Sequence, residues 1–227
     1  MGIKDLILQN MLNTPKYTIG LQDLAKGRTI LKLARELEDV DFKIHLQARA
    51  GLDYFSPDLE KAKVQLAAVT ALMDDLEPNN IDSPEIIHVV SYSEAVRLAN
   101  PSIINESIRI TLAALDRYRV LRKLGKIENM DYYRDLNERT EAMYQEAKAA
   151  IQILEQHFPN LYTAEGFYKI FEEGFFPVPY MLDPSNKYSK ATAWNTAIKN
   201  GGIRVIDAKG EIICTAKRYK SIIERIL

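Results

Sequence analysis

The stretch Glu85-Ile-Ile-His-Val-Val-Ser-Tyr-Ser-Glu94 decides the fold that we predict for this chain. Its first half is a short, nearly continuous apolar run, which is typical of a strand covered on both faces in a parallel sheet. Its second half is a polar loop that carries hydroxyls, a phenol and a carboxylate. Asn100-Pro101 then predicts a helix start, with asparagine as the N-cap and proline in the first turn. The segment therefore reads as strand, loop and helix.

The helix predicted after this loop runs to Arg119 and is amphipathic. Its apolar residues are spaced four, four and three apart, which places them on one stripe of a helix. The members of the stripe are Ile104, Ile108, Leu112 and Leu115. We expect this stripe to face the core.

Two similar units are predicted earlier in the chain. A weak strand at Lys16–Gly20 precedes a helix from Leu21 to Leu37, and a second strand at Asp41–Gln47 precedes the loop 48–55. Ser56-Pro57-Asp58 predicts the start of the next helix, with Ser56 as its N-cap. The apolar stripe of that helix is Leu59, Ala62, Leu66, Val69, Met73 and Leu76. The repeated order predicts a parallel sheet with crossover helices.

The two ends of the chain do not follow this order. Residues 1–13 are predicted to be a short helix. Residues 131–157 and Thr163–Glu173 are predicted to be helices. Three prolines then break the periodicity of Gly174–Pro184, which we expect to fold over the sheet as an apolar lid. A β-hairpin around Asp207–Gly210 and a short helix close the chain.

These patterns predict an α/β fold made of parallel strand–helix units of a partial TIM-type barrel. A complete barrel needs about 250 residues, and nearly half of this chain lies in the tail. The predicted domains are residues 1–130, which hold the βα units, and residues 131–227, which hold a helical extension, the Pro-rich lid and the C-terminal hairpin. The tail is helical with one hairpin.

Composition excludes several classes of protein. The chain has 30 basic and 31 acidic residues, so a role driven by bulk charge on nucleic acid or on a membrane surface is not expected. It has no apolar run near the roughly 20 residues that span a bilayer and no secretory leader. The single cysteine, Cys214, excludes an intrachain disulfide. We therefore expect a cytoplasmic protein.

The three histidines do not form a metal motif. His45, His88 and His157 have no metal-ligand spacing and no cysteine or carboxylate cluster beside them, so no metal site is predicted. His45 and His88 lie in predicted strands, and we expect them to be packed and hydrogen-bonded there.

Candidate site residues follow two of the predicted strands. Arg49 and the run Ser91, Tyr92 and Glu94 lie where the C-terminal ends of parallel strands meet, at the mouth where α/β proteins bind ligands. Gly51 allows another molecule to approach closely. Two alternatives stay open: Arg49 pairs with Asp53 in a solvated loop, or Glu94 is simply exposed before the helix.

At these residues the chain resembles a known family. The order of "HLQARAGLDYFSPDLEKAKVQLAAVTALM", "HVVSYSEAVRLANPSIINESIRITLAAL" and "EEGFFPVPYMLDPSNKYSKATAWNTAIKNGG" is similar to the C-terminal half of the large, epsilon-type subunit of adenosylcobalamin-dependent methylaspartate (glutamate) mutase. A looser similarity extends to the barrel components of ornithine aminomutase-type enzymes. The resemblance covers about residues 17–206. It rests on segment order and on Glu94, Pro179, Tyr180, Lys187 and Gly201.

The resemblance implies a TIM barrel that caps the upper face of adenosylcobalamin, which a separate small subunit carries. In that family, homolysis of the cobalt–carbon bond starts a carbon-skeleton rearrangement of an amino acid. Glu94 is implied to contact the adenosyl ribose, and the loop from Arg49 to Gly51 to face the corrin. We also expect cofactor contacts from Ser91, Tyr92 and Tyr180.

The chain departs from the family's pattern in three ways. A lysine that the family places four residues before Glu94 is Val90 here. The substrate-clamping arginines lie in the N-terminal half of the barrel, which has no counterpart in this chain. The Asp-x-His-x-x-Gly motif that ligates cobalt is also absent from it.

The resemblance therefore implies a component of a cobalamin-dependent mutase, an isomerase component if the chain is active. Its partners would be the small cobalamin-carrying subunit and a chain that supplies the N-terminal barrel half, or further copies of itself. The alternative is a non-catalytic remnant or assembly module of such a barrel. Binding of adenosylcobalamin together with a partner would favour the mutase component, and a stable monomer that does not respond to cobalamin would favour the remnant or module.

Overall fold

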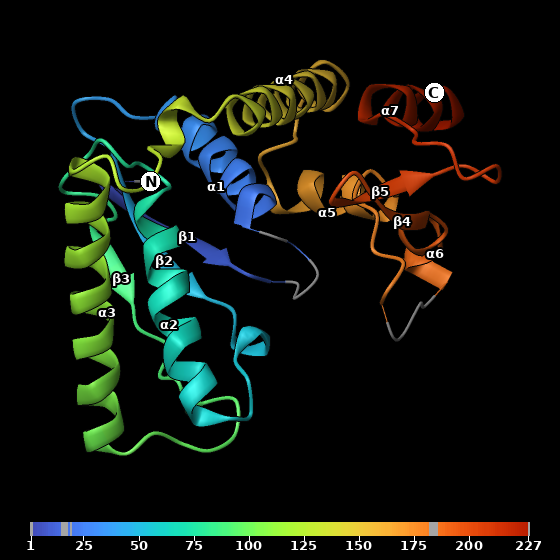
Figure 1. Ribbon diagram of the computed structural model, residues 1–227. Coiled ribbons are helices and arrows are strands. Elements are labelled where there is room, and N and C mark those ends of the chain that lie inside the picture. Colours follow the sequence, from blue (N-terminus) through green and yellow to red (C-terminus); the bar gives the residue numbers. More distant parts are fainter. Residues whose placement is uncertain (1, 15–17, 19, 182–185, 227) are drawn as a thin grey trace. The chain divides into compact units, whose positions relative to one another are not determined.

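The chain divides into two units, Met1–Tyr144 and Gln145–Leu227, in the computed structural model (Figure 1). The structure describes residues 2–14, 18, 20–181 and 186–226. None of the helices in these parts of the chain is long and apolar enough to cross a membrane.

A three-stranded parallel sheet forms the centre of the first unit. Its strands are β1 (Asp5–Leu12), β2 (Lys43–Ala50) and β3 (Ile86–His88), in the order β1-β2-β3 (Figure 1). The predicted α/β fold with parallel strands is therefore confirmed. A TIM barrel is not, because the sheet formed by the described residues is open at β1 and at β3.

Three helices accompany the sheet. The helices α1 (Gly20–Arg35) and α2 (Leu59–Asp74) pack against β1 and β2, and α3 (Pro101–Lys123) packs against α2. The side chains of β2 that face this helical layer alternate along the strand and are buried: Ile44, Leu46, Ala48 and Ala50. This alternation of side chains is what a strand with one buried face requires.

The opposite side of the sheet is called the open face here. It carries Asp5, Ile7, Gln9 and Met11 of β1, Lys43, His45, Gln47 and Arg49 of β2, and Ile86 and His88 of β3. All of these residues are exposed or half-buried. Seven of these ten residues have charged, amide or imidazole side chains, so the face is largely polar.

The helix predicted for residues 1–13 is wrong, because Asp5–Leu12 is a strand. Its apolar residues fit the helical period as well as the strand period. The segment is a strand because it pairs with β2 along its whole length. The weak strand predicted at Lys16–Gly20 falls largely on residues 15–17 and 19, which lie outside the described residues. Gly20 already belongs to α1.

The predicted helix starts differ in accuracy. Asn100 caps α3 as predicted, since its Oδ1 accepts a hydrogen bond from the Ile103 amide at 3.0 Å. The predicted start at Ser56 is two residues early. Asp58 is the N-cap of α2 and accepts from the Glu60 and Lys61 amides, because a carboxylate at that position reaches two free N–H groups.

The predicted stripe of α2 is confirmed in Ala62, Leu66, Val69, Met73 and Leu76, which are buried. The stripe of α3 is wrong in its orientation. Ile104, Ile108 and Leu112 are 44%, 39% and 57% exposed. The buried residues of α3 are Ile103, Ser107 and Thr111, because small residues let α3 approach its neighbours closely.

The strand β3 also differs from the expectation of a strand covered on both faces. It is only three residues long and forms an edge of the sheet. His88 is exposed, and Ile86 and Ile87 are half-buried. An edge strand has a neighbouring strand on one side only. The apolar run predicted a strand here, but it did not show that this strand would lie at the edge of the sheet.

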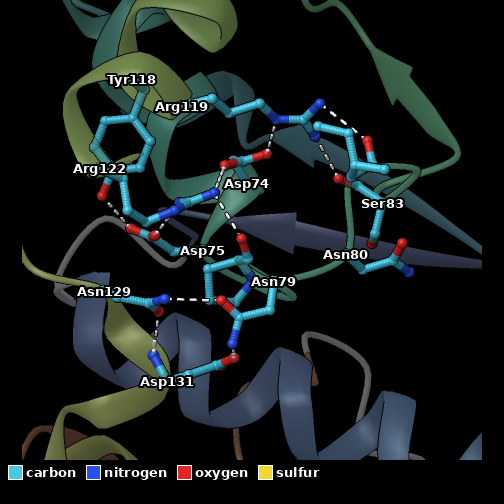
Figure 2. Close-up of polar contacts among 12 residues, drawn as sticks. Asp74, Asp75, Asn79, Asn80, Ser83, Tyr118, Arg119, Arg122, Asn129 and Asp131 are labelled. Carbon is cyan, nitrogen blue, oxygen red and sulfur yellow. Dashed lines mark hydrogen bonds and ion pairs between the residues drawn. The ribbon is translucent and has the colours of Figure 1, made fainter. Parts of the chain in front are cut away.

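Buried ion pairs fasten α2 to α3 at the end of the sheet where β3 begins (Figure 2). Asp74 and Asp75 end α2 and are almost fully buried. Arg119 Nε donates to Asp74 Oδ1 at 2.6 Å, and Arg122 binds both carboxylates, with Nη1 3.1 Å from Asp75 Oδ1. Figure 2 also shows Arg119 reaching Ser83 in the loop before β3. These contacts join α2, α3 and the loop before β3.

The second unit contains the end of α4 (Arg134–His157) and the helices α5 (Ala164–Glu172), α6 (Ser189–Thr192) and α7 (Thr215–Ile226). Its core consists of Leu154, Leu161, Ile170, Phe175, Tyr219, Ile222 and Ile223. The helix predicted at Thr163–Glu173 is confirmed, with Thr163 as its N-cap.

An antiparallel hairpin of β4 (Asn195–Lys199) and β5 (Gly202–Ile206) completes this unit. The predicted hairpin around Asp207–Gly210 is displaced, because the strands turn at Asn200-Gly201, where both residues have positive φ. Such a pair matches the twist of two-residue hairpins. Asp207–Gly210 forms the following turn, and only a single bridge joins Ile206 to Ile212.

The lid segment Gly174–Pro184 is described up to Met181, and Leu182–Pro184 lie outside the described residues. Phe175 is fully buried in the core of the second unit, with its ring 4.9 Å from that of Tyr219 and 5.3 Å from that of Phe158. Tyr180 is 76% exposed. Within the segment expected to form an apolar lid, the ring of Tyr180 is therefore not buried.

Candidate functional site

The C-terminal ends of the three strands and the loops that follow them form the mouth of the sheet. The Gly51 amide donates to the carbonyl of Leu12 at 2.9 Å, which joins the ends of β2 and β1. Thr14 Oγ1 donates to Asp53 Oδ1 at 3.0 Å and joins the two loops. A Cβ on Gly51 would lie 2.6 Å from the Thr14 Cβ, so glycine is required where the loops touch.

An ion pair between Lys26 and a buried carboxylate, Asp23, holds the loop after β1. Lys26 Nζ donates to the carbonyls of Met11 and Thr14, at 3.2 and 3.3 Å, and to Asp23 Oδ1 at 3.0 Å. Asp23 is almost fully buried and also accepts from the Asn13 amide. An ammonium group has three protons, and all three are engaged, so Lys26 is a positioning residue. The sequence signal for it was an Asp and a Lys three residues apart in the first turns of a helix.

Ser91 and Tyr92 are turned toward α3. Ser91 Oγ lies 3.1 Å from Ser107 Oγ, and the Tyr92 phenol donates to Glu106 Oε2. Lys63 of α2 pairs with the other oxygen of Glu106 at 2.9 Å. The hydrogen bond to Glu106 raises the pKa of Tyr92, and the same bond lowers the pKa of Glu106. Both predicted contact residues are buried and hold the loop on the helical layer.

Glu94 has a different environment. Its Oε1 accepts from the Ser91 amide at 2.9 Å, while the Glu94 amide donates to the Ser91 carbonyl. The side chain is exposed, and no described residue donates to its second carboxylate oxygen. Glu94 therefore closes a tight turn and still offers one oxygen to a ligand.

Arg49 projects from β2 onto the open face, because its neighbours Ala48 and Ala50 are buried against the helices. Its Nε donates to the Ala50 carbonyl at 3.3 Å. The ion pair between Arg49 and Asp53, which the sequence left open as an alternative, is not formed. Asp53 instead accepts a hydrogen bond from Thr14. The residue that pairs with Arg49 in the next strand is His88.

A row of hydrogen bonds crosses the open face, and sequence reasoning missed it. Gln47 Nε2 donates to Gln9 Oε1 at 2.7 Å and lies 3.5 Å from His88 Nδ1. His45 Nε2 lies 3.0 Å from Asp5 Oδ1. Both strand histidines are hydrogen-bonded as expected. They are not packed in a core, because both project onto the open face, where His45 is half-buried and His88 is exposed.

A groove of about 580 Å³ runs between β3 and α3. It is lined by Ile87, His88, Val89, Ser91, Glu94, Ile104, Ser107, Ile108, Thr111 and Leu112. The hydroxyl of Thr111 is buried and has no hydrogen-bond partner among the described residues. The exposed stripe of α3 and the edge of the sheet therefore share one apolar surface.

The structure thus separates the predicted site residues. Gly51 and Glu94 belong to the mouth, Arg49 lies on the open face, and Ser91 and Tyr92 lie in the helical layer. Tyr180 belongs to the second unit, where its ring is exposed. Among the described residues, no group of three His, Cys, Asp or Glu side chains is placed to hold a metal ion.

No protein-family model matches the chain, and no curated protein matches it either.

Proposed function

We propose that this chain is part of a βα barrel that a partner chain completes, and that the assembled barrel caps adenosylcobalamin in a carbon-skeleton mutase acting on an amino acid. One observation supports the first half of this proposal most directly. Three parallel βα units form a sheet that is open at β3, next to an exposed apolar stripe on α3. Closed barrels of this class have eight such units.

The groove beside β3 has the features that a further strand–helix unit would use. The outer edge of β3 offers unpaired backbone groups to a parallel strand. Ile104, Ile108 and Leu112 offer an apolar surface to the helix that follows this strand. Thr111 Oγ1 at the floor of the groove lacks a hydrogen-bond partner that an incoming polar group would supply.

The residues at the mouth fit one part of the cofactor. The free oxygen of Glu94 can accept hydroxyl protons of a ribose, and a carboxylate does so more strongly than a neutral amide. The close contact of Gly51 with Thr14 keeps side-chain bulk away from the ends of β1 and β2. When bound, the cofactor supplies the radical that starts the rearrangement. Cobalt would be ligated by the small partner subunit.

The other predicted contact residues have supporting roles in this proposal. Ser91 and Tyr92 fix the loop that presents Glu94, through Ser107 and Glu106 of α3. This contribution is positional: the loop is held in place before the cofactor arrives. Tyr180 remains a proposed contact on the second unit.

The proposal is tested by co-expression with adjacent open reading frames that encode a barrel half and a small Asp-x-His-x-x-Gly protein. The purified complex should bind adenosylcobalamin, measured by its absorbance spectrum and by calorimetric titration. Glu94→Gln keeps the bond from the Ser91 amide and should weaken binding on the order of tenfold or more, the cost of a lost charge-assisted hydrogen bond.

Glu128→Gln is the matched control, because it removes the same charge from an exposed residue outside the mouth. Unchanged affinity in Glu94→Gln would overturn the role of Glu94. A complex that forms fully and binds no adenosylcobalamin would favour the alternative function, an assembly module that retains the sheet without the cofactor site.

A further inference from the structure

The exposed side of α3 carries a leucine between two opposite charges. Arg109 lies three residues before Leu112, and Asp116 lies four residues after it, so both charges are neighbours of Leu112 on the surface of the helix. All three side chains are exposed. The two charges are seven residues apart, which places them on nearly the same side of α3 and roughly 10 Å apart along its axis.

These two charges are not used inside the chain. No described residue forms an ion pair or a side-chain hydrogen bond with Arg109 or Asp116. The charges of α3 that face α2 are engaged instead: Glu106 pairs with Lys63, and both Arg119 and Arg122 pair with Asp74. The outer pair of charges is therefore available to another molecule.

The apolar stripe of α3 has charge along one border only. On the border toward the sheet, Ser107 and Thr111 are buried and uncharged. On the outer border, Arg109 and Asp116 flank the stripe, and the exposed Ala113 adds little bulk beside Leu112. A second helix could therefore approach closely at Leu112, and its own charges would decide its direction and register.

This order of charges is complementary to itself when two copies of α3 run antiparallel. A twofold axis that crosses α3 between residues 112 and 113 lies equally far from Arg109 and Asp116. It would place Arg109 of each copy opposite Asp116 of the other, and would bring the two copies of Leu112 together at the axis. A parallel pair would instead place arginine against arginine and aspartate against aspartate, which like charges disfavour.

We infer that the chain on its own forms a twofold dimer through α3, in which Leu112 lies at the axis and two ion pairs between Arg109 and Asp116 fix an antiparallel register. Burial of the apolar stripe supplies the attraction, and the ion pairs at its border select the orientation. The inference does not rest on the proposed function. In the proposed complex, the partner chain would displace the second copy from the stripe.

Charge reversal tests the register, with the dimer dissociation constant of the full chain measured by sedimentation equilibrium. Arg109→Asp and Asp116→Arg should each weaken the dimer at least about tenfold, since the symmetry turns two attractions into two repulsions. An equimolar mixture of the two variants should dimerise about as tightly as the wild type, because an acidic border then faces a basic one. Arg117→Asp is the matched control, since it lies about 140° around the helix from Leu112 and should leave the dimer unchanged.

Disulfide cross-linking tests the position of the axis. Cys214 is exposed, so Cys214→Ser is the background. In it, Leu112→Cys should join two copies on mild oxidation, whereas Arg117→Cys should not. A monomeric wild type, an unchanged dissociation constant in Arg109→Asp, a mixture of the two charge variants that stays monomeric, or no cross-link at residue 112 would overturn this interface, even if the chain binds adenosylcobalamin with its partners.

Discussion

The phenol of Tyr118 donates a hydrogen bond to Oδ2 of Asp75, joining α3 to the end of α2 across 43 residues of sequence. Asp75 is 4% exposed, and its other oxygen is 3.1 Å from Arg122 Nη1. Burial raises the pKa of Asp75 to about 6, although Tyr118 and Arg122 act in the opposite direction. The carboxyl that fastens the two helices is therefore one that folding makes easier to protonate.

This pKa shift predicts a pH-dependent stability. A carboxyl whose pKa lies above its ordinary value of 3.8 keeps its proton in the folded state while the unfolded chain loses it. The free energy of unfolding should therefore fall as pH rises from about 4 to about 6, by up to about 3 kcal/mol, and level off above. Asp75→Asn should remove this slope in urea unfolding curves between pH 4 and about 8. The exposed Asp82→Asn should retain it, and a wild-type slope in Asp75→Asn would contradict the assignment.

Loss of Arg122, the cation that Asp74 and Asp75 share, should lower the free energy of unfolding by more than the pH change does. Arg122 is the partner of both Asp74 and Asp75, so Arg122→Ala leaves two buried carboxylates with less compensation. We expect a loss of about 3–5 kcal/mol in the free energy of unfolding. Arg117→Ala, on the exposed side of the same helix, should change it by less than about 0.5 kcal/mol. Similar losses in both variants would show that Arg122 does not hold the helices together.

The N-cap of α3 gives a smaller, local prediction. Asn100→Ala removes the acceptor of the Ile103 amide and should cost about 1 kcal/mol in thermal or urea unfolding. Asn100→Asp keeps an acceptor at the same position and should preserve stability, because aspartate caps equally well. An alanine variant as stable as the wild type would mean that another group satisfies this amide.

The exposed stripe of α3 predicts association. Leu112→Glu should leave the stability of the chain nearly unchanged, because Leu112 is already 57% exposed. The wild-type chain alone should form dimers or larger species at micromolar concentration by light scattering, and Leu112→Glu should reduce them by burying a charge in the contact. Val64→Glu is the matched control on the exposed side of α2 and should behave like the wild type. A clean wild-type monomer would count against the proposal.

Phe175 should determine the stability of the second unit. It is fully buried against Phe158 and Tyr219, so Phe175→Ala should destabilise that unit by about 3–5 kcal/mol. Hydrogen exchange of the α7 amides is the direct measurement, because it reports on this unit alone. Phe167→Ala, an exposed aromatic on α5, should leave their protection nearly intact. Equal exchange in the two variants would argue against a core role for Phe175.

Local signals predicted the elements whose causes are local. Asn100-Pro101 and Thr163 marked true helix starts, because capping depends only on the next few backbone amides. The stripe of α2 was correct because α2 lies between the sheet and α3 and needs a wide apolar face. The strand–loop–helix order likewise predicted the parallel sheet.

Features set by partners distant in sequence were not predicted. The segment that became β1 reads as a helix until β2 is placed beside it. The apolar period of α3 predicted a helix, yet Ser107 and Thr111 face inward because α2 packs close there. Asp74 and Arg119 are 45 residues apart, and each alone reads as a solvated charge. Arg49 was found from its place after a strand, whereas its neighbour His88 needed the register.

The bare edge of β3 has a consequence for how cells would make this protein. A strand with free backbone groups pairs with whatever extended chain reaches it first, including one that is still leaving a ribosome. In the complex that we propose, a chain made in excess over its partner would therefore expose a surface on which misassembly begins. For that complex, we expect the genes of the two chains to be translated together and in matched amounts.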